Sequence, residues 1–107
     1  MLVLAPHPDD EVFGCGGAVA LYAASGAQVR VLIVTDGGAQ AGTDAAVQLA
    51  RLRASESRQA LALLGVDDVV FAGLPDRSLT GSAALAALVD QQVRFFGPDV
   101  VLAPSLW

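Results

Sequence analysis

The residues of this sequence that could do chemistry gather directly behind a short apolar segment at its start. Leu2–Ala5 runs into Pro6-His7-Pro8-Asp9-Asp10-Glu11, which holds the only histidine of the chain and three consecutive carboxylates. Imidazole and carboxylate groups together are the ligands of a zinc-type metal site, and a further carboxylate beside the metal could act as a general base toward water. The prolines restrict the backbone and so fix where these side chains point. The segment therefore predicts a metal-dependent catalytic site, against the alternative in which an aspartate simply caps a helix.

The elements that must hold this site alternate between strand and helix along the chain. We expect strands at 2–5, 29–34, 67–72 and 99–103, and helices at 12–25, 44–64 and 82–97. Apolar strands alternating with helices are typical of a parallel sheet with helices on both faces. The prediction is one α/β domain over 1–107, a Rossmann-like three-layer sandwich with a mainly parallel sheet, apparently truncated after its fourth strand. Right-handed crossovers would bring the loops at His7, Asp36, Asp76 and Pro104 to one edge, where open α/β sheets bind ligands.

Composition narrows the class of protein. Net charge is −5, and the six cationic residues are all arginines that form no basic run, so nucleic acid is not an expected partner. No stretch reaches the roughly 18 apolar residues of a membrane span, and the start lacks the features of a signal peptide. The single cysteine, Cys15, cannot form an internal disulfide. These features predict a cytoplasmic protein.

The chain is also unusually apolar, with 54% hydrophobic and 16% charged residues, against about 25% charged in typical domains. We therefore expect it to cover apolar surface, either in a homo-oligomer or with a remainder of its own fold. The ending at Trp107, one loop after a core strand, favours the remainder.

Several residues outside the first turn are candidates for the site. A helical wheel centred on Leu49 places Leu52, Glu56, Ala60 and Leu63 on one predicted buried face, with Arg53 inside it. Because buried charges must be paired, we predict an internal Arg53–Glu56 ion pair, or one that braces the active-site loops or reaches the cleft. Asp36 and Asp76 either contact substrate or stabilise their turns. The glycines around Cys15 lack dinucleotide-binding spacing and predict close packing instead.

Read together, these motifs resemble the LmbE-like, or PIG-L, family of zinc-dependent de-N-acetylases. The similar features run in family order: His7-Pro8-Asp9-Asp10-Glu11, Gly-Cys-Gly-Gly at 14–17, Thr35-Asp36-Gly37, Arg53-x-x-Glu56 and Gly73-Leu74-Pro75-Asp76. The resemblance implies that His7 and Asp10 hold zinc or another divalent metal and that Asp9 is the general base. It further implies removal of an N-acetyl group from an aminosugar conjugate.

The family's third zinc ligand and its second histidine follow the fourth strand, where this chain stops. The resemblance therefore implies an N-terminal part that holds half of a metal site and would be poorly active alone. Two alternatives remain open. One is a non-catalytic Rossmann-like binding or assembly module, and the other is an esterase or phosphatase that uses magnesium.

Overall fold

The computed structural model describes residues 1–36, 43–75, 79 and 81–104, and only the backbone of Phe13. Seven elements alternate along the described part of the chain: β1 (Leu2–Ala5), α1 (Asp10–Ala24), β2 (Arg30–Thr35), α2 (Asp44–Leu63), β3 (Val69–Leu74), α3 (Ala83–Phe96) and β4 (Val101–Leu102). The four strands form one sheet in the order β3-β2-β1-β4, and every neighbouring pair is parallel. The predicted α/β fold is therefore confirmed, with β4 shorter than expected.

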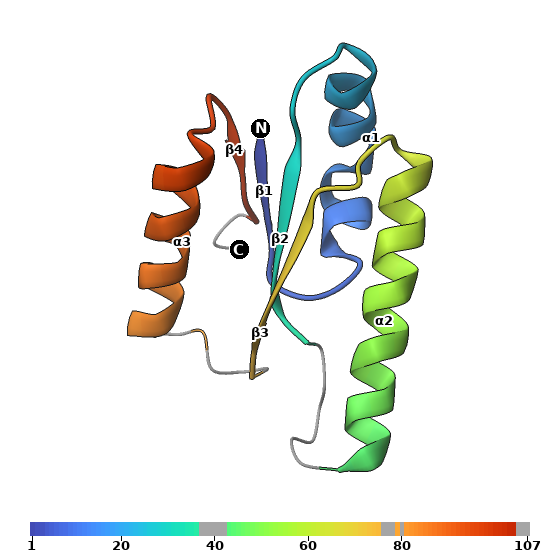
Figure 1. Cartoon of the computed structure of the whole chain (residues 1–107), viewed down its shortest axis with the longest axis vertical. Helices are drawn as coiled ribbons and strands as arrows, with labels where there is room; N and C mark the ends of the chain where they lie inside the picture. Colours follow the sequence, from blue (N-terminus) through green and yellow to red (C-terminus); the bar gives the residue numbers. More distant parts are fainter. Residues whose placement is uncertain (37–42, 76–78, 80, 105–107) are drawn as a thin grey trace.

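Helices cover both faces of the sheet, with α1 and α2 on one side and α3 on the other (Figure 1). Each strand divides its apolar residues between the two faces, because successive side chains point in opposite directions. Residues of the α1–α2 side form one core cluster, which includes Val3, Ala5, Val19, Val31, Ile33 and Leu61. Residues of the α3 side form a second, in which Leu2, Leu32 and Val34 pack against Leu85, Leu88 and Phe96. The two clusters make the three-layer arrangement that the sequence predicted.

Polar caps and a glycine set the ends of α2 and α3. The Thr43 hydroxyl accepts a hydrogen bond from the Ala46 amide at 3.1 Å, so Thr43 caps α2 and Asp44 is the first residue of the helix, as the predicted range had it. Ser82 caps α3, with its hydroxyl accepting from the Leu85 amide at 3.1 Å. Gly97 has a positive φ of 64° and ends α3, a conformation that glycine adopts at little cost.

The predicted buried face of α2 is wrong. Leu52 and Leu63 are 55% and 89% exposed and Glu56 is exposed, whereas Ser57 and Leu61 are fully buried. The helix is therefore turned by about 100°, one residue's step, from the predicted orientation. The face toward the sheet carries the small residue Ser57 beside Leu61, and small side chains allow close packing. The exposure of Glu56 removes the reason for a buried ion pair with Arg53, which is itself half-buried.

Large apolar side chains remain exposed on every helix. In α1, predicted to be buried nearly all round, Leu21 and Tyr22 are 73% and 42% exposed, and Phe95 of α3 is 82% exposed. The sequence predicted apolar surface of this kind, and a homo-oligomer that covers it stays a prediction. None of the described helices is long and apolar enough to cross a membrane.

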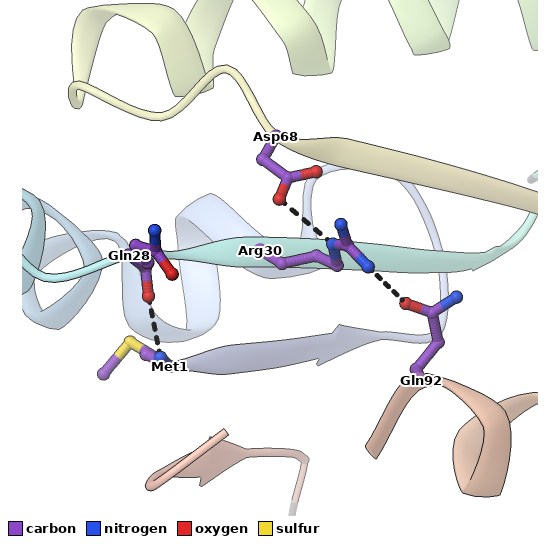
Figure 2. A network of polar contacts seen from close by, with 5 residues as sticks. All are labelled: Met1, Gln28, Arg30, Asp68 and Gln92. Atoms are coloured by element: carbon purple, nitrogen blue, oxygen red, sulfur yellow. Dashed lines mark hydrogen bonds and ion pairs between the residues drawn. The ribbon is translucent and has the colours of Figure 1, made fainter. Parts of the chain in front are cut away.

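A polar network ties together the edge of the sheet where β1 and β2 begin (Figure 2). The Arg30 guanidinium donates to Asp68 at 3.0 Å and to Gln92 at 3.2 Å, and it lies 4.9 Å from the centre of the Phe96 ring. The Met1 ammonium donates to the Gln28 carbonyl at 2.8 Å. Asp68 is thus an ion-pair partner that helps hold β2, β3 and α3 together.

The strand order reverses at β1. From β1 the chain moves through β2 to β3 on one side, and α3 then carries it back to β4 on the other side of β1. In open α/β sheets, ligands bind outside the carboxyl ends of the strands at such a reversal. The residues that follow β1 therefore stand at the place in this fold best suited to a ligand.

Candidate active site

A tight turn joins β1 to α1 and brings two of the predicted site residues together. The His7 amide donates to Asp10 Oδ2 at 3.0 Å, and the Asp10 amide donates to the His7 carbonyl at 3.3 Å. In the same turn, His7 Nδ1 lies 3.4 Å from Asp10 Oδ2, with the two side chains 43% and 48% exposed. The imidazole and the carboxylate are thus adjacent, held by backbone contacts, and open to a ligand.

Asp9 occupies the N-cap position of α1 but does not cap it. Its φ is 87°, in the left-handed region, and its side chain makes no capping hydrogen bond. It is the only described residue other than glycine with a positive φ. This conformation is strained for a residue with a Cβ, although aspartate tolerates it better than most. Since Asp9 is exposed and takes no part in capping, the helix-cap alternative does not explain its carboxylate.

Thr35, at the end of β2, anchors the residue that precedes His7. The Pro6 carbonyl accepts two hydrogen bonds from Thr35, one from the backbone amide at 2.9 Å and one from Oγ1 at 2.8 Å. Thr35 is 1% exposed. In the sequence, Thr35 is recognisable only as part of the Thr35-Asp36-Gly37 motif, and this anchor was not predicted. The signal that could have predicted it is a hydroxyl at the buried end of a predicted strand, because a buried hydroxyl needs a hydrogen-bond partner.

A cavity of about 730 Å³ opens beside the turn, between β1 and β4. Polar groups enter it from the turn, and apolar groups line it from the strands. Its lining residues are Val3, Leu4, Pro6, His7, Asp10, Gly14, Cys15, Leu102, Ala103 and Pro104. The cavity therefore coincides with the reversal of strand order and confirms that the loops at His7 and Pro104 share one edge.

Glu11, the third acid of the cluster, is buried and not at the cavity surface. It is 1% exposed, and neither carboxylate oxygen has a hydrogen-bond partner in the described structure. Burial raises the pKa of this carboxyl. The backbone amide of Glu11 and the hydroxyl of Ser57 lower the pKa in part, although neither approaches in hydrogen-bonding geometry. The sequence did not predict this burial, because an acid in the first turn of a helix is usually explained by the helix dipole alone.

Cys15 faces the cavity from α1. Its thiol donates to the Glu11 carbonyl at 3.3 Å, and the backbone at Cys15 departs from helical geometry. Burial, and then the charge of Glu11, raise the pKa of the thiol. A raised pKa keeps the thiol protonated, so Cys15 is unsuited to act as a nucleophile.

The remaining predicted site residues lie on other elements or outside the described residues. Asp36 is half-buried just beyond β2, where its amide donates to the Leu74 carbonyl at 3.4 Å, so it lies at the same edge of the sheet. Arg53 is half-buried on α2 and Glu56 is exposed there. Asp76 lies outside the described residues. Within the described ranges, no three side chains are arranged to hold a metal ion, so His7 and Asp10 stand as a pair.

Known proteins are similar to this chain over most of its length. The PIG-L family model, described as GlcNAc-PI de-N-acetylase, matches residues 2–107. The chain is 39% identical over 99 residues to a 1D-myo-inositol 2-acetamido-2-deoxy-alpha-D-glucopyranoside deacetylase of Actinosynnema mirum, covering 80% of this chain and 35% of that protein.

Two crystal structures show similar folds. The N,N'-diacetylchitobiose deacetylase from Pyrococcus horikoshii matches with a TM-score of 0.89 and 30% identity, over 99% of this chain and 40% of that one. The 4-carboxy-2-hydroxymuconate hydratase from Pseudomonas putida matches with a TM-score of 0.80 and 29% identity, over 98% of this chain and 46% of that one. The chain thus spans less than half the length of each of these three proteins.

Proposed function

The chain belongs to the PIG-L family of de-N-acetylases, and we propose that it forms part of a metal-dependent hydrolase that removes the acetyl group from an N-acetylated aminosugar conjugate. The observation that carries the proposal is the adjacent pair of His7 and Asp10 at the reversal of strand order. Asp9 lies between them in sequence, and its side chain makes no capping hydrogen bond. The names of the two deacetylase relatives support the substrate class, because each denotes an acetylated aminosugar.

The donor pair has the chemistry and the spacing that zinc requires. Two ligands at about 2.0–2.1 Å from a tetrahedral ion lie roughly 3.3–3.4 Å apart. His7 Nδ1 and Asp10 Oδ2 are separated by 3.4 Å. These two residues would hold zinc, or another divalent metal, and a further protein ligand would come from outside the described residues. A single imidazole favours zinc over magnesium, which prefers oxygen ligands.

Asp9 would act as the general base. A bound metal ion polarises the amide carbonyl and lowers the pKa of water. Asp9 would take the proton from the attacking water as its oxygen adds to the acetamide carbonyl carbon. The C–N bond then breaks, acetate forms, and the departing nitrogen takes up a proton and leaves as the free amine. Holding Asp9 in the left-handed conformation keeps its carboxylate out of the capping position and available for this step.

Other residues would line or support the substrate cleft. Asp36 is proposed to contact substrate, since it lies half-buried at the edge that carries the turn. Asp76 and the half-buried Arg53 keep the same proposed role, whereas exposed Glu56 has less geometric support. A cytoplasmic location also stays a prediction from the sequence.

The Asp9→Asn variant tests the assignment. In the complete hydrolase of which the chain is proposed to form part, we expect it to bind zinc like the wild type in calorimetry and to lose at least a hundredfold in release of free amine from an N-acetylglucosamine conjugate, because general-base catalysis typically contributes that much. The matched control is Asp67→Asn, an exposed aspartate near the opposite edge of the sheet, which should change neither property. If Asp9→Asn lost zinc and Asp10→Ala kept it, the roles of base and ligand would be misassigned.

A second candidate follows from the hydratase among the matching structures, since one fold can host different reactions. A hydratase adds water to a carbon–carbon double bond and releases no amine. Amine release from an acetylated sugar separates the proposed reaction from this one and from an esterase or phosphatase. A binding module would show no turnover with any of these substrates under any divalent metal.

A further inference from the structure

Glu11 is a buried acid for which the proposed reaction has no use. It lies in the first turn of α1, directly after Asp9 and Asp10, and is 1% exposed. Both of its carboxylate oxygens, and the Ser57 hydroxyl, are buried and lack a hydrogen-bond partner in the described structure. Three such oxygen atoms in one small region are unusual, because buried polar groups are nearly always hydrogen-bonded.

This arrangement costs stability. Removing a carboxyl from water without a hydrogen-bond partner is unfavourable, and an apolar side chain of similar length would fill the same space without that cost. Local violations of this kind are found where a site needs them. The position of Glu11 suggests what the need is, since it shares the start of α1 with the two proposed functional aspartates.

The buried side chain fixes how α1 begins. Glu11 is rigidly connected to Asp10 within the helix, so the placement of its side chain against α2 determines how the first turn is rotated. Ser57 is fully buried on α2, and its hydroxyl lies close enough to the Glu11 carboxyl to lower the pKa of that group, although the two do not meet in hydrogen-bonding geometry. A leucine at position 11 could pack in several orientations, whereas a carboxyl beside a single hydroxyl is favourable in only a few.

We propose that Glu11 and Ser57 form a positioning pair that holds the first turn of α1 against α2 and thereby directs Asp9 and Asp10 toward the metal. The inference rests on the proposed function, because it assigns both residues to the same site. Neither residue touches substrate or metal. Their contribution is to keep the strained Asp9 backbone and the His7–Asp10 hydrogen bond in place at the expense of fold stability.

The test compares Glu11→Met with Glu11→Gln, and Ser57→Ala with Ser55→Ala. Methionine keeps the length of the side chain and removes its polarity, whereas glutamine keeps a group that can hydrogen-bond to Ser57. Ser55 is an exposed serine on the same helix and serves as the control. Three properties are measured on the metal-free chain and with zinc alone: urea unfolding, amide exchange by NMR, and zinc affinity by calorimetry.

Amide exchange is the readout that does not depend on metal. The amides of His7, Asp10 and Val12 are all hydrogen-bonded within the turn. We expect Glu11→Met and Ser57→Ala to exchange at least tenfold faster at these amides, with no change at Val31 in the sheet. Glu11→Gln and Ser55→Ala should stay within threefold of the wild type. Glu11→Met should unfold at the same or a higher urea concentration and bind zinc at least tenfold more weakly.

Each other outcome overturns an identifiable claim. Unchanged exchange in Glu11→Met and Ser57→Ala would overturn the positioning pair, as would a Glu11→Met variant that unfolds at lower urea, because Glu11 would then simply stabilise the fold. A wild-type chain that fails to bind zinc while the exchange results hold would leave the positioning of the turn supported and would show that His7 and Asp10 hold no metal without a further protein ligand.

Discussion

The Thr35→Val substitution asks how firmly the turn of the candidate site is tied to the sheet. Thr35 is 1% exposed and donates twice to the Pro6 carbonyl, from its amide at 2.9 Å and from Oγ1 at 2.8 Å. Valine has nearly the same size and shape, and it keeps the backbone donor. The substitution therefore removes one hydrogen bond and little else.

The size of the stability loss follows from the hydrogen bond that the variant keeps. Because the Pro6 oxygen keeps the amide of residue 35 as a donor, no buried acceptor is left without a partner. The free energy of unfolding should fall by the net value of one hydrogen bond, about 1 kcal/mol. In a domain of this size, that lowers Tm by roughly 4 °C. If zinc binding must restore the turn that the lost hydrogen bond had held in place, the same free energy is taken from binding, and the zinc affinity would fall about fivefold.

The assay uses Thr35→Ser as the matched variant. Serine keeps the hydroxyl and loses a buried methyl group, which also costs about 1 kcal/mol. Urea unfolding followed by circular dichroism should therefore show similar losses for both variants, while calorimetry should show weaker zinc binding only for Thr35→Val. Wild-type unfolding of Thr35→Val, or equal loss of zinc affinity in Thr35→Ser, would refute the anchoring role.

Three further predictions concern the fold around the site. In urea unfolding, Leu61→Ala should lower the free energy of unfolding by about 2–5 kcal/mol and Leu63→Ala by less than about 0.5 kcal/mol, because Leu61 is fully buried and Leu63 is 89% exposed. A larger loss for Leu63→Ala than for Leu61→Ala would support the helix face predicted from the sequence. Arg30→Met should cost about 1–2 kcal/mol in thermal unfolding, since it removes an ion pair with Asp68, a side-chain hydrogen bond and an aromatic contact. Burial raises the folded-state pKa of Glu11 above 4.5, so the folded state keeps a proton that the unfolded state releases, and wild-type stability should fall as pH rises from 4.5 through that pKa. The Glu11→Gln variant should lack this component in urea unfolding across pH, and parallel pH profiles would contradict it.

Local patterns in the sequence predicted the elements well. The alternation of apolar strands with helices, and the caps and glycines between them, gave all seven elements of the described chain, because these signals depend on neighbouring residues alone. The same is true of the turn after β1. His7 and Asp10 are three residues apart, so a single tight turn is enough to bring them together.

The facing of α2 shows where such patterns fail. Periodicity identified an apolar stripe along α2 but did not show which side of the helix would pack against the sheet. The side that is buried contains Ser57, and the leucine-rich side is exposed. Helix packing depends on how closely two surfaces can approach, and this is a property of both partners. The burial of Glu11 was not predicted for the same reason, since it involves Ser57 of α2, more than forty residues later in the chain.

By itself, the sequence determined the fold class and the placement of the proposed site residues His7, Asp9 and Asp10 at the end of the first strand, because backbone preference and side-chain chemistry are local. Only the tertiary structure decided the strand order β3-β2-β1-β4, the cavity where that order reverses, the Thr35 anchor and the burial of Glu11. Each of these depends on contacts between segments far apart in the chain, whose free energies are set by packing and solvent exclusion and not by the residues that flank them.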